Sequence, residues 1–215
     1  MKKQIPYYFI FCLLAFWTFS LLWLGFGDKI SIHKTLTQYH SNQWDLMFQL
    51  ITFCGDGIFL VIISFLFLLI NIRTALLQII SYAVSGILCT TLKYTLFSES
   101  KRPYFYLKDD LTFHKIIDFT YFTAHSFPSG HTTSIFAIMT IFALVYQNSR
   151  VAMIVFFLFA LLVAYSRIYL SQHFLIDVVA GSFLGSCIAY LVFQTLNPRL
   201  IKFNASLLKL SKHNE

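Results

Sequence analysis

The sequence predicts an all-α, polytopic membrane protein with six transmembrane helices. Of its 215 residues, 58% are hydrophobic and only 12% are charged, which is about half the charged fraction of an ordinary globular chain. The apolar residues gather in six segments that are long enough, or nearly so, to cross the ~30 Å hydrocarbon core of a bilayer. These segments lie near residues 7–27, 49–70, 74–97, 131–147, 151–169 and 174–194.

The whole chain, residues 1–215, is expected to form a single membrane-embedded domain with its core at about residues 49–195. The first apolar segment follows a Met-Lys-Lys start, as in a secretory signal, but it is about 20 residues long and lacks a small-residue cleavage site. We therefore expect an uncleaved transmembrane helix. Two connections, 28–48 and 98–130, are long and polar, whereas 71–73 and 148–150 are tight turns.

The distribution of basic residues predicts the orientation in the membrane. One side would carry eight Lys and Arg residues and a single acid, and the other eight bases and eight acids. The first side is therefore expected to be the cytoplasm, with both termini on it and residues 196–215 forming an amphipathic tail along a bacterial-type inner membrane. The eight cytoplasmic bases are Lys2, Lys3, Arg73, Arg150, Arg199, Lys202, Lys209 and Lys212. The net charge of +7 is then explained by basic residues on the cytoplasmic side, where they contact anionic lipid head groups. We therefore do not expect a nucleic-acid partner.

Between the last two apolar segments, residues 166–177 contain an arginine, a histidine and an aspartate. His173 and Asp177 are four residues apart, so they share a face if the last segment is helical. A carboxylate on one imidazole nitrogen leaves the other nitrogen free to act as a nucleophile. The alternative is an ion pair at the membrane boundary that caps the helix.

The second polar motif, Pro128-Ser129-Gly130-His131, ends the long 98–130 connection just before the fourth apolar segment. Free N–H groups at a helix N-terminus make an anion site, and glycine allows close approach to the backbone. His131 would be placed there to deliver a proton. The alternative is an ordinary helix N-cap with an interfacial histidine.

A third group of residues opens the same connection. Lys93 lies near the end of the third segment, and Arg102 carries the planar fork that matches phosphate oxygens. The alternative is a basic flank of a membrane helix. Together, the three motifs supply the cations, the helix N-terminus and the two imidazoles needed for phosphoryl transfer through a phosphohistidine.

On these motifs the chain resembles the phosphatidic-acid phosphatase type 2 superfamily, which includes membrane lipid phosphatases and soluble vanadium haloperoxidases. The second motif and the Ser166-Arg167…His173…Asp177 pattern match in identity and spacing, and the resemblance covers about residues 75–195. The first motif departs from the family pattern, because the family spacing would put its lysine at position 95, which is Thr95. We assign the role of the first-motif lysine to Lys93, with Lys101 as the substitute.

The resemblance implies a role for each matched side chain. His173 is the nucleophile, Asp177 orients it, and His131 protonates the leaving oxygen and then activates water. The remaining matched residues hold the phosphate: Lys93, Arg102, Ser129, Gly130 and Arg167. The family needs neither a metal nor another cofactor.

Three functions remain open from the sequence. The first is a lipid phosphatase acting at the outer membrane face on undecaprenyl pyrophosphate, phosphatidylglycerol phosphate, phosphatidic acid or lipid A, with a polyprenyl or phospholipid phosphate favoured. The second is a lipid phosphotransferase that uses the same phosphohistidine. The third is a lipid-binding transporter or scaffold without chemistry. The sequence does not predict the oligomeric state.

Outside these motifs, two acidic features stand out. Asp56 lies within the second segment, where it would line a lipid path, pair with a motif cation or occupy a helix irregularity satisfied internally. Asp109 and Asp110 could in principle bind a cation, but we interpret them as a solvated loop pair.

Overall fold

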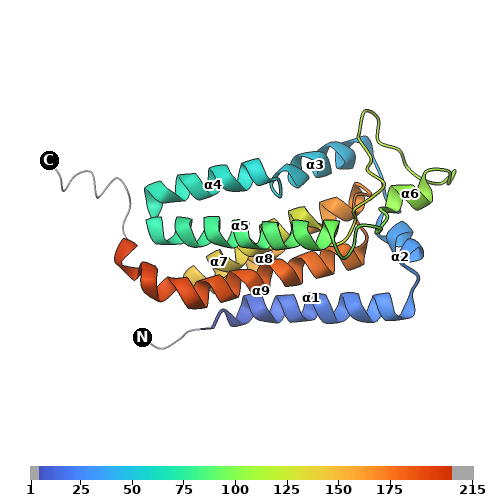
Figure 1. Cartoon of the computed structure of the whole chain (residues 1–215). Helices are drawn as coiled ribbons and strands as arrows, with labels where there is room; N and C mark the ends of the chain where they lie inside the picture. The colour runs from blue at the N-terminus through green and yellow to red at the C-terminus, as the bar shows by residue number, and fades with distance from the viewer. Residues whose placement is uncertain (1–4, 205–215) are drawn as a thin grey trace.

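The computed structural model describes residues 5–204, and this part of the chain is all-α. It folds into a bundle of long helices that run along one common axis (Figure 1). The long helices are α1 (Tyr7–Phe26), α4 (Gly57–Ile70), α5 (Ile72–Tyr94), α7 (Gly130–Val145), α8 (Arg150–Tyr169) and α9 (Leu175–Leu200). The shorter elements are α2 (Lys29–Leu36), α3 (Asn42–Phe53), α6 (Pro103–Leu107) and the 3-10 helix Ile201–Phe203.

Among the described residues, four helices are long and apolar enough to cross a membrane, namely α1, α5, α8 and α9. Helices α3 and α4 qualify together as a fifth span, bent by 53°. The chain is therefore a multi-pass membrane protein with four to five candidate spans. The sequence predicted six, and the remaining segment forms α7, which is apolar but only 16 residues long.

The second predicted segment, 49–70, is broken in the structure. Helix α3 ends at Phe53, and α4 starts at Gly57 with Asp56 as its N-cap. The Asp56 carboxylate accepts a hydrogen bond of 2.9 Å from the backbone N–H of Ile58. Of the three roles open for Asp56, the structure thus shows the helix irregularity, with the acid satisfied by the helix that it caps.

Helix α7 lies at the centre of the bundle, packed against α4, α5, α8 and α9. Every residue from Thr132 to Leu144 is buried. Helix α9 approaches α7 so closely that a methyl group added at Gly185 would lie 2.1 Å from the Thr133 carbonyl oxygen. Glycine is the residue that permits such contact between two helix backbones.

The two ends of the bundle differ in character. At one end α5 and α8 finish while α7 and α9 begin, and α2, α6 and the long loop before α7 gather there (Figure 1). At the opposite end lie the start of α1, the turns between α4 and α5 and between α7 and α8, and the end of α9. Helix α9 continues to Leu200, beyond the boundary at 194 predicted for its span, and residues 205–215 of the predicted tail lie outside the described part.

The close packing of α7 and α9 predicts unequal effects of one substitution at two glycines. Gly185→Ala places a methyl group against the backbone of α7 and is expected to cost roughly 1–3 kcal/mol, as overpacking of a core does. Gly25→Ala is the matched control, since a methyl group there meets nothing within 4 Å. Thermal unfolding of the detergent-solubilised variants measures the difference, and equal melting temperatures would contradict the described packing.

Candidate active site

The connection between α8 and α9 folds into a tight reversal that ends at His173. The backbone N–H groups of Gln172 and His173 both donate to the carbonyl oxygen of Arg167, at 3.0 and 3.1 Å. Ser171 sits between the two helices with a φ of 51°, in the left-handed region. The reversal buries the His173 side chain, which is only 2% exposed.

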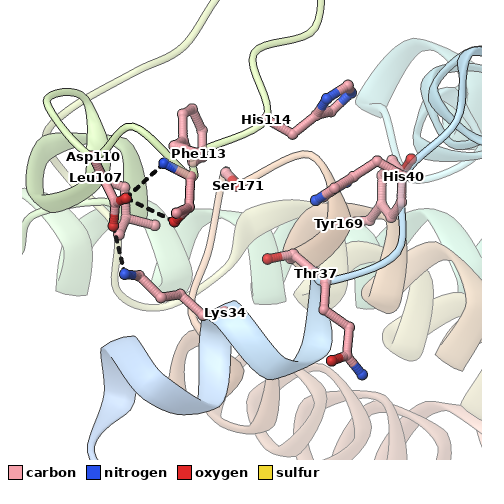
Figure 2. Close-up of a pocket in the computed structure, with 11 residues that line it drawn as sticks. Lys34, Thr37, His40, Leu107, Asp110, Phe113, His114, Tyr169 and Ser171 are labelled. Carbon is pink, nitrogen blue, oxygen red and sulfur yellow. Dashed lines mark hydrogen bonds and ion pairs between the residues drawn. The ribbon is translucent and has the colours of Figure 1, made fainter.

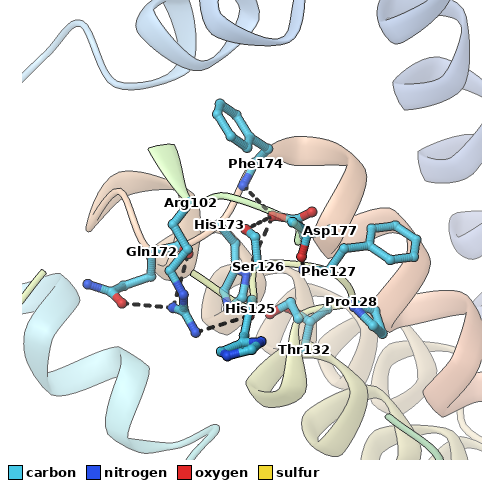
Figure 3. A network of polar contacts seen from close by, with 12 residues as sticks. Arg102, His125, Ser126, Phe127, Pro128, Thr132, Gln172, His173, Phe174 and Asp177 are labelled. Carbon is cyan, nitrogen blue, oxygen red and sulfur yellow. Dashed lines mark hydrogen bonds and ion pairs between the residues drawn. The ribbon is translucent and has the colours of Figure 1, made fainter. Parts of the chain in front are cut away.

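Asp177, in the first turn of α9, holds this connection and the α7 loop together. Its Oδ2 atom accepts hydrogen bonds from the Phe174 backbone N–H at 2.9 Å and from the Ser126 hydroxyl at 2.5 Å (Figure 3). The same oxygen lies 3.4 Å from Nδ1 of His173, a nitrogen without a hydrogen-bond partner among the described residues. The Asp177 carbonyl oxygen also accepts from the Ser129 backbone N–H at 3.0 Å.

The N-terminus of α7 has the features of an anion-binding position. Its first N–H groups have no partner within the helix, and they carry the positive end of the helix dipole. A methyl group added at Gly130 would meet nothing within 4 Å, so the backbone is accessible there. The hydroxyls of Thr132 and Thr133 donate to the side chain and carbonyl oxygen of Ser129, both at 2.9 Å, and fix this turn.

His131, the second residue of α7, packs against the break between α3 and α4. A methyl group at Gly55 would lie 3.2 Å from Cβ of His131 and 2.8 Å from Val163. The absence of a side chain at Gly55 therefore lets α3 and α4 pass directly behind the histidine.

Arg102 reaches this site from the long loop before α7. Its guanidinium donates to the Ala124 carbonyl at 2.8 Å, and to the carbonyl and the side-chain oxygen of Gln172 at 3.2 and 3.0 Å (Figure 3). These acceptors are neutral, so they orient the Arg102 guanidinium without cancelling its positive charge. Burial lowers the pKa of Arg102, and nearby Asp177 opposes that shift.

Arg167 and the two candidate lysines differ in their surroundings. Arg167 is 8% exposed and donates from Nη1 to the Thr52 hydroxyl at 2.7 Å. Lys93 stands in the last turn of α5. The ammonium of Lys101 instead lies 3.9 Å from the Glu99 carboxylate, on the long loop before α7.

The charges of the predicted residues act on His173. Burial lowers the pKa of His173 well below its usual range, and the charges of Arg102, Arg167 and Lys93 lower it further, as does His131. The imidazole is therefore neutral and keeps a lone pair. The surrounding cluster carries an excess of positive charge that suits an anion.

The structure adds residues to which the sequence gave no role. Ser126 and Gln172 lie inside or beside the quoted motifs, yet only the fold shows that they bind Asp177 and Arg102. Thr52 and Gly55 come from the second segment. His33, in α2, is fully buried, with Nε2 3.0 Å from the Ser171 hydroxyl.

Comparison with known proteins places the chain in a family. Residues 74–201 match the PAP2 superfamily, so the chain belongs to this superfamily, and the resemblance found in the sequence is confirmed. An undecaprenyl-diphosphatase of Sulfolobus acidocaldarius is 34% identical over 87 residues, which are 40% of this chain and 41% of that protein. The chain thus aligns with less than half the length of this relative.

Two crystal structures share the fold. LpxE of Aquifex aeolicus superposes with a TM-score of 0.65 and 23% identity, over 76% of this chain and 93% of that chain. A PAP2-type phosphatidylglycerolphosphate phosphatase of Bacillus subtilis superposes with a TM-score of 0.61 and 20% identity, over 93% and 98%.

Because His33 is buried, we expect the free energy of unfolding to depend on pH. Burial lowers its pKa to about 4, against about 6.5 for a histidine in the unfolded chain. The unfolded chain therefore takes up this proton first, and roughly 3 kcal/mol of stability present above pH 6.5 is lost as the pH falls towards 4.

His33→Gln keeps a partner for Ser171 but does not titrate. Its free energy of unfolding is expected to fall less than that of the wild type between about pH 6.5 and 4. Parallel melting curves at several pH values measure this difference, with pH 7.5 as the reference where both side chains are neutral. Identical pH profiles for the two proteins would contradict a neutral, buried His33.

Proposed function

We propose that this protein is an integral membrane lipid phosphatase that works through a phosphohistidine on His173. One observation carries the proposal: a neutral, buried imidazole with a carboxylate at one nitrogen, surrounded by Arg102, Arg167 and Lys93. A neutral imidazole is a nucleophile, and three cations neutralise the oxygens of a transferring phosphoryl group.

In the first step, Nε2 of His173 attacks the phosphorus in line with the lipid oxygen. The N–P bond forms as the P–O bond breaks, and His131, which takes up a proton when the negative phosphate binds beside it, gives this proton to the leaving lipid oxygen. Asp177 accepts the Nδ1 proton of His173 in a hydrogen bond and stabilises the positive charge that develops on the ring. The distance of 3.4 Å between Nδ1 and Oδ2 shortens for this step, as catalytic hydrogen bonds do when substrate binds.

In the second step, His131, now neutral, removes a proton from water. The resulting oxygen attacks the phosphorus, the N–P bond breaks, and His173 returns to its neutral form. Arg102, Arg167, Lys93 and the N-terminus of α7 balance the phosphate charge throughout both steps. This charge comes from the protein itself, so we propose that the chemistry proceeds without a metal.

The proposed substrate is a polyprenyl or phospholipid carrying a terminal phosphate or pyrophosphate. The aligned relative named undecaprenyl-diphosphatase supports this class, as does a groove of about 510 Å³ between α5 and α7. The groove runs past Gly86 and reaches Gly130 at the phosphate-binding turn. A lipid tail in the groove would leave its phosphate at the N-terminus of α7.

We propose that α7 is a sixth, short crossing and that the site faces the extracytoplasmic side of the inner membrane. At 1.5 Å per residue its 16 residues span about 24 Å, and the surrounding helices shield it from lipid. Arg73, Arg150, Arg199 and Lys202 belong to elements at the end of the bundle opposite the site, which would be cytoplasmic under the positive-inside rule.

From the proposed mechanism, we expect the detergent-solubilised protein to release phosphate from one or more members of a panel of lipid phosphates and pyrophosphates. We expect activity without added metal and in the presence of EDTA, measured well below the melting temperature. His173→Ala should abolish it, and His131→Ala should lower the rate by about 10²–10⁴-fold through loss of acid–base catalysis. Gly25→Ala is the control for expression and folding.

Each other outcome has a definite meaning. Phosphate transfer only in the presence of a second lipid would indicate a phosphotransferase. Unchanged function in a well-folded His173→Ala variant would indicate a scaffold or transporter. Phosphatase activity that requires magnesium and is lost in EDTA would contradict the charge balance proposed for the site.

The α5–α7 groove makes a separate prediction about lipid tails. Gly86→Phe fills the groove and is expected to raise KM for a long-chain lipid phosphate about tenfold or more, a loss of roughly 1.4 kcal/mol in binding. Hydrolysis of the tail-free p-nitrophenyl phosphate should not change. Gly86→Ala is the matched control, because a methyl group at Gly86 meets nothing within 4 Å; equal KM values for the two variants would exclude the groove.

A further inference from the structure

Three side chains with metal-binding atoms meet on the outer loops, outside the phosphate site. His40 belongs to the connection between α2 and α3, Asp45 to the first turn of α3, and His114 to the long loop after α6. Among the described residues they form one compact group, in which one ligand atom of each lies within 4.8 Å of the others. We call this group the His40–Asp45–His114 triad.

The hydrogen bonds of Asp45 already resemble those of a metal ligand. Asp45 is 6% exposed, and its Oδ1 atom accepts a hydrogen bond of 2.6 Å from the Tyr169 hydroxyl. Its Oδ2 atom faces Nε2 of His114 at 2.8 Å. A metal-binding carboxylate is commonly oriented in this way, with one oxygen held by a protein donor and the other directed at the ion.

The two imidazole rings of the triad are stacked on each other. The rings of His40 and His114 stack with centroids 4.4 Å apart and planes at 17°. Ligand atoms at about 2.0 Å from a tetrahedral ion are separated by about 3.3 Å. The His114–Asp45 contact thus needs to widen by only about 0.5 Å for both atoms to bind one ion.

A cavity of about 250 Å³ adjoins the triad and gives space for a further ligand. His40, His114 and Tyr169 line it, and Figure 2 shows both imidazoles at the end of the cavity away from the Lys34–Asp110 ion pair. This pair is closed at 2.5 Å, so the Lys34 ammonium is already engaged by another carboxylate. A water molecule in the cavity could complete a four-coordinate site.

We propose that the His40–Asp45–His114 triad binds a divalent transition-metal ion, with zinc as the best match. Two imidazole nitrogens and one carboxylate oxygen suit Zn²⁺, whereas Mg²⁺ and Ca²⁺ prefer sites built from oxygen ligands. Zinc binding here is independent of which lipid the phosphate site accepts.

The position of the triad gives the ion a structural role. It would join the long outer loop, through His114, to α3 and to Tyr169 at the end of α8. Tyr169 lies four residues before His173, and the same loop continues to Ser126 and His131. Neither His131 nor His173 lines the cavity, so the ion would brace the loop without touching the transferring phosphoryl group.

The test uses full-length protein purified in detergent with an affinity tag that contains no histidine. The wild type should carry about one zinc per chain by elemental analysis, and after EDTA treatment Zn²⁺ should raise its melting temperature. Competition with a chromophoric chelator should show that His114→Ala and Asp45→Asn bind Zn²⁺ about 100-fold more weakly or worse, and Tyr169→Phe about 10–100-fold more weakly. Asp109→Asn, an exposed acid on the same loop, is the matched control and should bind as the wild type does.

Two further measurements decide the matter if a variant fails to fold. Co²⁺ added to the metal-free wild type should give the intense visible bands of four-coordinate cobalt. Zn²⁺ should also slow amide hydrogen exchange in residues 108–122 of the wild type. Background zinc content together with no change in melting temperature, cobalt spectrum or exchange would overturn the proposal, as would equal zinc affinity in the wild type and a folded His114→Ala variant.

Discussion

The site depends on the hydrogen bonds that converge on Asp177. Its carboxylate joins the start of α9 to Ser126, its carbonyl oxygen joins α9 to Ser129, and its Oδ2 atom stands beside the His173 imidazole. The two histidine motifs are thereby fixed relative to each other by one residue. A buried carboxylate is costly unless it is satisfied, so the pocket around His173 depends on the position of the loop before α7.

Helix packing supplies the frame in which these bonds form. Gly185 lets α9 lie against the backbone of α7, and Gly55 lets the broken α3–α4 segment lie against His131. Both contacts bring the backbone of one helix directly against a helix that carries candidate site residues. Half-buried Arg102 and buried Arg167 are oriented by neutral acceptors from neighbouring segments.

The sequence predicted the local parts of this arrangement and missed the distant ones. His173 and Asp177 are four residues apart on either side of the start of α9, and Ser129 to His131 begin α7, so these contacts join near neighbours in the sequence. The contact of Arg167 with Thr52 joins residues 115 positions apart, and that of His33 with Ser171 joins residues 138 positions apart. No periodicity encodes such contacts. The break of the 49–70 segment was signalled by Gly55-Asp56-Gly57, but the hydrophobicity on both sides outweighed that signal.

The match to the superfamily begins only at residue 74, yet the preceding helices touch the back of several residues in the site. Thr52 holds Arg167, Gly55 supports His131, His33 meets the loop before His173, and Asp45 holds Tyr169. The helices before residue 74 therefore form an N-terminal clasp around the candidate site. They belong to the shared fold as well, because the Bacillus subtilis structure superposes over 93% of this chain. A substitution in the clasp can therefore change the position and rigidity of a side chain in the candidate site without replacing that side chain.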